Sequence, residues 1–154
     1  LSQPQTLWFN TGTLCNIECL NCYIESSPQN ARLVYISTAE VDAYLDQLDD
    51  RSWGVGEIGF NGGEPFLNPE MIGMARAALL RGYEVLILTN AMRPMMRPRI
   101  QLGLKSLLLE FGQKLTLRVS ARSGTRMMQK RGRDMRGSTA NIASTLTRMI
   151  PLTL

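Results

Sequence analysis

Short apolar runs alternate with amphipathic segments along the first 120 residues, and this alternation limits the fold more than any other feature. The apolar runs have the length and composition of buried strands, and the amphipathic segments repeat apolar residues at helical spacing. We predict strands at residues 6–10, 55–60, 84–89 and 115–120, and helices at 38–50, 69–81 and 98–111. Repeated strand–helix–strand connections form parallel units, so we expect an α/β open sheet or a partial barrel.

Capping signals mark the ends of two predicted helices. Residues 37–40 read Ser-Thr-Ala-Glu, which is a capping box. Asn68 before Pro69 is expected to be an N-cap with proline in the first helical position, and Gly82 is expected to close the same helix.

All three cysteines, Cys15, Cys19 and Cys22, lie within eight residues, and the chain has no histidine. A set this dense and odd in number is poorly suited to disulfides, which stabilise by joining distant segments. The lack of histidine excludes Ser-His-Asp and Cys-His catalysis, and any metal site that needs imidazole. Metal or cluster ligation is therefore the favoured interpretation.

The spacing Cys-x3-Cys-x2-Cys allows three thiolates to converge on one soft metal centre. A closed zinc site usually has four protein ligands, so zinc would need a further donor such as Asp or Glu. In a four-iron cluster, three cysteines leave one iron free to bind a substrate or cofactor. A zinc loop and simply buried cysteines remain open as alternatives.

Two motifs together resemble those of the radical S-adenosylmethionine superfamily. The first motif follows the first predicted strand, and the second follows the next one. They read Cys15-Asn-Ile-Glu-Cys19-Leu-Asn-Cys22-Tyr23 and Gly62-Gly63-Glu64-Pro65. The resemblance extends over residues 6–120 and implies an α/β fold, a partial parallel (β/α) barrel that is incomplete at its C-terminal side.

The resemblance also implies two cofactors. Cys15, Cys19 and Cys22 would ligate three irons of a 4Fe-4S cluster, and S-adenosylmethionine would chelate the fourth iron. The Gly-Gly-Glu turn would meet the amino group of that cofactor through backbone carbonyls and a carboxylate. The expected cofactor-binding residues are Gly62, Gly63, Glu64, Pro65, Tyr23, Asn90 and Ser120.

Three of those residues are assigned from their positions in the resemblance. Asn90 and Ser120 end the third and fourth predicted strands and match positions that often touch the ribose or carboxylate. Asn21 departs from the family, which often has an aromatic residue there, near the adenine. We expect Tyr23 to take that contact.

The implied reaction is the reductive cleavage of S-adenosylmethionine to methionine and a 5′-deoxyadenosyl radical, which abstracts hydrogen from a substrate. Such an oxidoreductase needs an electron donor such as flavodoxin or ferredoxin. The substrate cannot be assigned, because specificity lies largely in the second half of such barrels and in added domains.

Residues 121–154 form a second predicted unit, distinct from the core at 1–120. They carry seven basic residues and one acid, whereas the first 120 residues carry ten and twelve. The net charge of +4 thus comes from this tail, which lacks the interleaved aromatics of nucleic-acid binders, so nucleic acid is disfavoured as a partner. A frameshifted or truncated gene product and a genuine basic tail both remain open.

No run in the sequence approaches the roughly 20 apolar residues of a membrane helix, and the first residues lack a secretory signal. We therefore expect a cytoplasmic protein without a membrane partner. The predicted function is that of a radical S-adenosylmethionine enzyme or its N-terminal half. The alternative is a truncated, non-catalytic fragment that binds zinc or an iron-sulfur cluster.

Overall fold

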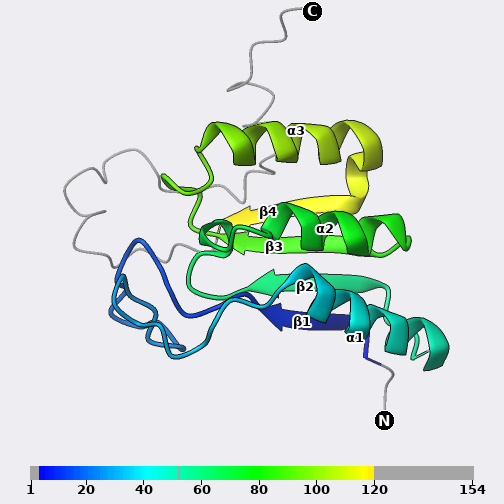
Figure 1. Ribbon diagram of the computed structural model, residues 1–154, viewed down its shortest axis with the longest axis horizontal. Helices are drawn as coiled ribbons and strands as arrows, with labels where there is room; N and C mark the ends of the chain where they lie inside the picture. The colour runs from blue at the N-terminus through cyan, green and yellow to red at the C-terminus, as the bar shows by residue number, and fades with distance from the viewer. Residues whose placement is uncertain (1–3, 52, 120–154) are drawn as a thin grey trace, which may run out of the picture.

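Four parallel strands form a single sheet in the computed structural model, which describes residues 4–51 and 53–119 (Figure 1). The strands follow one another across the sheet in chain order. They are β1 (Thr6–Asn10), β2 (Glu57–Asn61), β3 (Glu84–Thr89) and β4 (Leu115–Val119). The structure therefore has the α/β architecture that the alternating sequence pattern predicts.

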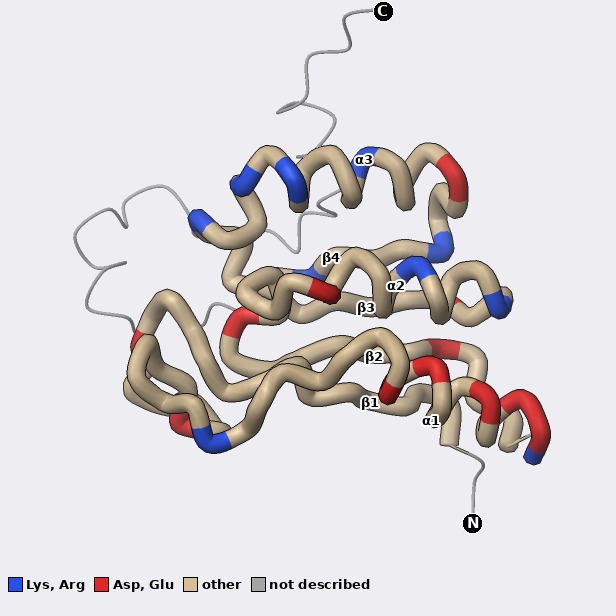
Figure 2. Tube along the Cα trace, in the orientation of Figure 1, with Lys and Arg blue, Asp and Glu red and all other residues tan. Residues whose placement is uncertain are grey.

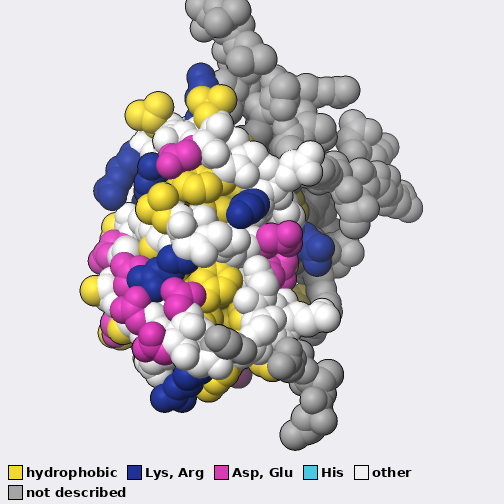
Figure 3. All heavy atoms as spheres, turned by 90° about the vertical axis from the view of Figure 1, so that its right-hand side faces the viewer, with side chains coloured by type: hydrophobic (Ala, Val, Ile, Leu, Met, Phe, Trp, Pro, Cys, Tyr) yellow, Lys and Arg dark blue, Asp and Glu magenta, His cyan; other side chains and the backbone are white. Residues whose placement is uncertain are grey.

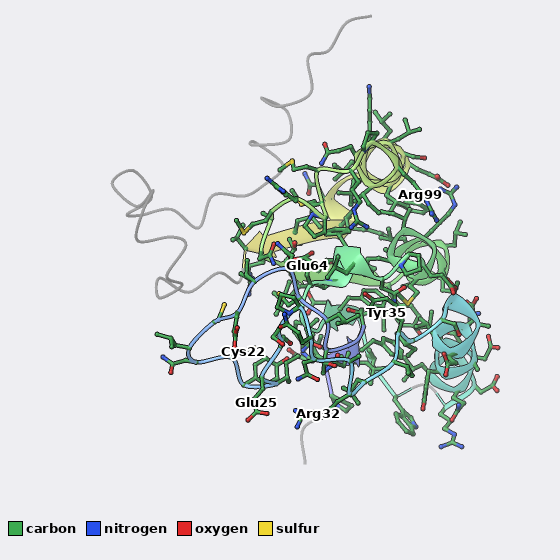
Figure 4. All side chains as sticks on the ribbon, turned by 60° about the vertical axis from the view of Figure 1, so that its left-hand side comes forward. Cys22, Glu25, Arg32, Tyr35, Glu64 and Arg99 are labelled. Carbon is green, nitrogen blue, oxygen red and sulfur yellow. The ribbon has the colours of Figure 1, made fainter. Side chains whose placement is uncertain are left out.

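Three helices connect the strands and lie on one face of the sheet (Figure 4). They are α1 (Thr38–Arg51), α2 (Met71–Leu80) and α3 (Pro98–Phe111), with short 3-10 helices η1 (Pro65–Leu67) and η2 (Gly112–Lys114). Helix α2 contacts both α1 and α3. Sequential strands with every helix on one side are the arrangement of a partial (β/α) barrel.

The hydrophobic core fills the space between the helices and one face of the sheet. Side chains alternate between the two faces of a strand, and one row across all four strands is fully apolar and buried. The row consists of Phe9, Phe60, Ile87 and Leu117, which are register partners. This packing fixes which strand residues face away from the helices.

On the opposite face of the sheet, the Trp8 indole lies over Gly59. A Cβ atom at Gly59 would stand 2.4 Å from Cε3 of Trp8, so no larger residue fits beneath the ring. The indole is 43% exposed. The face away from the described helices therefore presents a large aromatic side chain over β1 and β2.

An ionic network joins α1 to the end of α2, at the edge of the sheet where the strands begin. The Arg81 guanidinium contacts the carboxylates of Asp42, Asp46 and Asp49 at 3.1, 2.5 and 3.2 Å. The Tyr83 hydroxyl donates to Asp49 at 2.5 Å. Figure 2 shows the acidic positions along α1, and Figure 3 shows acidic and basic side chains mixed with hydrophobic ones on this side.

The structure confirms several predicted elements and corrects the bounds of others. β1, β3 and α3 have their predicted bounds, and α1 ends one residue later than predicted. β2 occupies residues 57–61, not 55–60. Ser120 and the predicted tail at residues 121–154 lie outside the described residues.

The start of α2 differs most from the prediction. The helix begins at Met71, two residues after Pro69, and Glu70 takes the cap position. Asn68 instead makes a turn in which its Oδ1 accepts from the Glu70 N–H at 2.9 Å. Gly82 ends the helix as predicted, with a φ of +94° that favours glycine.

Among the described residues, no helix combines the length and the apolar character needed to cross a bilayer.

Candidate functional site

Three loops meet at the edge of the sheet where the strands end, as expected for parallel strands. They are the cysteine loop, residues 11–37 after β1, the turn Gly62–Pro65 after β2, and the segment that begins at Asn90 after β3. The Gly63 N–H donates to the Gly12 carbonyl at 2.9 Å, and the Asn90 amide donates to Asn16 Oδ1 at 3.0 Å. The middle turn and the third loop thus both bind the cysteine loop.

The cysteine loop folds back on itself through backbone hydrogen bonds. The Cys15 N–H donates to the Ser27 carbonyl at 3.1 Å, and the Cys22 N–H donates to the Cys19 carbonyl at 3.2 Å. All three cysteines are free thiols; Cys15 is buried, whereas Cys19 and Cys22 are half-buried. Figure 4 shows Cys22 on this loop, which projects away from the sheet beside Glu25.

Two of the sulfurs already accept hydrogen bonds from nitrogen. The Asn90 amide nitrogen lies 3.6 Å from Cys15 Sγ, and the Ser26 N–H donates to Cys22 Sγ at 3.3 Å. Hydrogen bonds to sulfur help to set the properties of iron-sulfur clusters. Cys15 and Cys22 therefore already have the kind of hydrogen bond to sulfur that such clusters use.

Burial favours the protonated form of Cys15 and Cys19 when no cation is present. It raises the pKa of Cys15, as does the Glu64 carboxylate, against a backbone hydrogen bond from Ile17 that lowers it. Burial also raises the pKa of Cys19, and the charge of Cys22 adds to the effect. A bound metal ion reverses this preference, because it stabilises thiolate directly.

Within residues 4–51 and 53–119, no three Cys, Asp or Glu side chains stand close enough together to hold a single metal ion. The three thiols are on one loop but are not gathered around one point.

Glu64, labelled in Figure 4, is the most enclosed charged group of the site. Only 2% of its surface is exposed. Its carboxylate accepts hydrogen bonds from the Thr89 hydroxyl at 2.8 Å and from the Asn90 N–H at 2.8 Å. It also accepts from the Phe66 N–H at 3.1 Å. Desolvation raises its pKa, and these three donors oppose the rise. Glu64 thus ties its own turn to the end of β3.

The two glycines before Glu64 pack against the backbone of the cysteine loop. A Cβ atom at Gly63 would stand 2.2 Å from the Leu14 carbonyl oxygen, and one at Gly62 would stand 2.7 Å from the Gly12 oxygen. Gly62 also has a φ of +146°. The glycine pair predicted a close backbone approach, and the partner in this structure is the cysteine loop.

The other predicted site residues differ in their surroundings. Asn90 is 7% exposed and lies between the Glu64 carboxylate and Cys15. Tyr23 is 75% exposed. Pro65 is buried in the first turn of η1. Ser120 is not among the described residues, so its predicted role stays a prediction.

Sequence reasoning missed two residues of the site, Thr89 and Ser26. Thr89 is fully buried and donates to Glu64, and the signal for it is a polar residue at the end of an otherwise apolar strand. Ser26 is 3% exposed, and its hydroxyl has no hydrogen-bond partner among the described residues. No local pattern marks Ser26.

Comparison with known proteins gives one family match. A family model described as "Radical SAM superfamily" matches residues 9–142. The Fe-coproporphyrin III synthase of Methanosarcina barkeri is 32% identical over 88 residues, which make up 57% of this chain and 21% of that protein.

Solved structures of Streptococcus suis SuiB have a similar fold. SuiB matches with a TM-score of 0.57 at 19% identity, and SuiB bound to S-adenosylmethionine with 0.58 at 19%. SuiB bound to the precursor peptide SuiA matches with 0.58 at 21%. These matches cover 74–76% of this chain and 23–24% of SuiB, so the chain spans about a quarter of SuiB's length.

Proposed function

Because this chain belongs to the radical SAM superfamily, we propose that its cysteine loop binds a 4Fe-4S cluster and that the cluster and S-adenosylmethionine are used together. The observation that carries this proposal is the packing of the cysteine loop against the Gly62–Pro65 turn. Two motifs from different strands form one surface there, joined by the Gly63–Gly12 and Glu64–Leu14 backbone hydrogen bonds at 2.9 and 3.0 Å.

The donor set fits an iron-sulfur cluster. Cys15, Cys19 and Cys22 are free thiols on a loop without histidine, and thiolate is the usual ligand of such clusters. A cubane offers each thiolate a separate iron, so the three sulfurs do not have to share one ion. The cluster would thus use three cysteines and leave one iron for the methionine part of S-adenosylmethionine.

Residues beside the loop would hold S-adenosylmethionine. The Gly62–Pro65 turn would receive its amino group, because backbone carbonyls and the Glu64 carboxylate attract an ammonium group. Tyr23 is exposed and free to stack on the adenine. Asn90 and Ser120 would contact the ribose or the carboxylate, and the described contacts of Asn90 place it next to Cys15.

When bound, the two cofactors together supply reductive cleavage of the sulfonium and hydrogen abstraction from a substrate. The protein's own residues position them. Glu64 accepts hydrogen bonds from Thr89 and Asn90 at the end of β3, and the Asn90 amide donates to Cys15 Sγ. An electron donor such as flavodoxin or ferredoxin and a reducing, cytoplasmic compartment complete the proposal.

A second candidate function is cluster or zinc binding without turnover. The observation in its favour is that binding needs only the cysteine loop, whose three free thiols the structure describes. The named relatives concern a coproporphyrin and a precursor peptide, so they do not indicate a common substrate.

The test is anaerobic reconstitution with iron and sulfide, followed by electron paramagnetic resonance of the reduced protein with and without S-adenosylmethionine. We expect a four-iron signal that changes when the cofactor is added. Cys19→Ser should lose the cluster, whereas Gln29→Ala, on the same loop, should keep it. A cluster that does not respond to S-adenosylmethionine, or tight zinc binding in its place, would favour the second candidate.

A further inference from the structure

Ser26 is a buried residue of the cysteine loop that the proposed function leaves without a role. Its hydroxyl oxygen has no hydrogen-bond partner among the described residues, although only 3% of the residue is exposed. Buried hydroxyl groups are nearly always hydrogen-bonded in folded proteins. An unpartnered one indicates a partner that binds there.

The backbone of Ser26 already contacts a proposed cluster ligand. Its N–H donates to Cys22 Sγ at 3.3 Å, and the Glu25 N–H donates to the Cys22 carbonyl at 3.0 Å. These two bonds fix the turn from Cys22 to Ser26. Only Cα and Cβ separate the serine oxygen from the nitrogen that contacts the sulfur, so the hydroxyl lies in the immediate surroundings of Cys22.

The hydroxyl of the neighbouring residue, Ser27, does have hydrogen-bond partners. Ser27 Oγ accepts hydrogen bonds from the N–H groups of Gln29 and Asn30, at 3.3 and 3.1 Å, and its carbonyl accepts from Cys15. Ser27 is therefore engaged in holding the loop together. The Ser26 hydroxyl takes no such part in the described structure.

We propose that the Ser26 hydroxyl donates a hydrogen bond to sulfur at the Cys22 corner of the cluster and raises the reduction potential of the cluster. This inference rests on the proposed function. One-electron reduction by an external donor makes the cluster sulfurs more negative, and a hydrogen bond to a more negative acceptor is stronger. The hydroxyl thus stabilises the reduced cluster more than the oxidised one.

The test is a redox titration of the reconstituted full chain with dithionite, followed by electron paramagnetic resonance. In Ser26→Ala, the ratio of reduced to oxidised cluster at a fixed potential should fall about five-fold, as one modest hydrogen bond would give. That change corresponds to ~40 mV for a one-electron couple. Gln29→Ala, at an exposed position of the same loop, is the control and should keep the wild-type midpoint.

A pair of variants of equal size guards against effects of packing. Ser26→Thr retains the hydroxyl and should keep the wild-type midpoint, whereas Ser26→Val should shift it as the alanine variant does. Equal midpoints for the threonine and valine variants would overturn the proposal. A wild-type chain that binds no cluster would overturn the proposed function, and this inference with it.

A spectroscopic readout decides the matter if the alanine and valine variants fail to bind the cluster. The Ser26 N–H is already one exchangeable proton beside Cys22 Sγ. Pulsed electron paramagnetic resonance in H2O and D2O should therefore reveal a second exchangeable proton at this corner of the reduced cluster, in the wild type and in Ser26→Thr. Finding the coupling of the Ser26 N–H alone at this corner would overturn the proposal.

Discussion

Gly63 has no side chain because the backbone of Leu14 occupies the space where one would begin. A Cβ atom there would stand 2.2 Å from the Leu14 oxygen, and the Glu64 N–H donates to the same carbonyl at 3.0 Å. The Leu14 oxygen and the Glu64 nitrogen both belong to the backbone and not to the end of a flexible side chain, so they cannot move aside easily. This residue therefore holds two loops in contact.

We expect Gly63→Ala to lower the free energy of unfolding by about 1–3 kcal/mol, the usual cost of overpacking. The measurement is urea denaturation of the chain without cluster. Gly56→Ala is the control, since a Cβ atom at Gly56 has no atom within 4 Å. Equal stability of the two variants would contradict the close approach of Gly63 to Leu14.

Glu64 makes the stability of the fold depend on pH. Its pKa is raised by burial, so its stabilising contribution is fully present below its unfolded pKa near 4.5 and is lost as pH rises through the folded pKa. Between those values the folded state binds more protons than the unfolded state.

Comparison with Glu64→Gln isolates this effect. We expect the stability of the wild type to fall relative to that of the variant as pH rises from about 4.5 toward neutrality, measured by urea denaturation across that range. Glu84→Gln is the control, because Glu84 is an exposed residue at the start of β3. The stability curve of this variant should follow that of the wild type. Parallel curves for wild type and Glu64→Gln would rule out the proposed titration.

At the scale of elements, one side chain joins the two ends of the cysteine loop to the start of α2. Asn68 is 1% exposed, and its amide donates to the carbonyls of Ile36 at 2.8 Å and Thr11 at 3.3 Å. Its Oδ1 accepts from the Glu70 N–H. The loop is thus closed by a side chain of the next βα unit.

We expect Asn68→Ala to destabilise the fold by about 2–4 kcal/mol, because it leaves buried carbonyls without donors. Thermal unfolding measures the loss, and Asn21→Ala, an exposed residue of the same loop, serves as the control. Hydrogen exchange should become faster at both ends of the cysteine loop. An unchanged midpoint would show that the loop closes without Asn68.

The α1–α2 ionic network has its own pH signature. Burial and the hydrogen bond to Asp49 raise the pKa of Tyr83 to about 12. The pKa of Tyr83 can be measured as the difference between the ultraviolet titrations of the wild type and of Tyr83→Phe. Asp49→Asn should lower this pKa. The contribution of the Tyr83 phenol to the free energy of unfolding is fully present below its unfolded pKa near 10. It is lost as pH rises through the folded pKa of about 12. A difference curve centred near 10 would contradict the contact between Tyr83 and Asp49.

For the whole molecule, the described chain has its proposed chemistry at one edge of the sheet, contributed by loops from three strands. A cluster bound by the cysteine loop exists only in the folded state, so its binding free energy adds to stability. The cysteine loop should gain most from this effect, because few regular elements hold it.

We expect anaerobic cluster loading to raise the free energy of unfolding by about 3 kcal/mol or more, the value for a ligand at a hundred times its Kd. Chelation or air oxidation should reverse the gain, as denaturation with matched samples would show. Cys19→Ser should be equally stable before and after the reconstitution treatment. A stabilised serine variant would mean that the gain has another source.

Most of the framework could be predicted from the sequence because it depends on local pattern. Apolar runs and helical spacing gave the bounds of β1, β3 and α3, and parallel connectivity brought the cysteine loop and the Gly-Gly-Glu turn to one edge. The start of α2 was less predictable, because Asn68 binds distant carbonyls of the preceding loop.

The details of the site depend on contacts between loops, which no local pattern encodes. The inward direction of Glu64 requires Thr89 at the end of another strand. The space over Gly59 is filled by Trp8, 51 positions earlier in the printed sequence. Ser26 is buried by the path of its own loop, so its environment emerges only with the fold.

The Arg81 network and the cysteine loop lie at opposite edges of the same sheet. Different solution conditions therefore weaken each of them. High ionic strength weakens the Arg81 network, because salt screens exposed charge pairs. Oxidants act on the cysteine loop once it carries the proposed cluster, because its cysteines are then thiolates, the form that oxidants attack. A sample kept in low salt but exposed to air, and one kept anaerobic but in high salt, would be damaged at opposite edges.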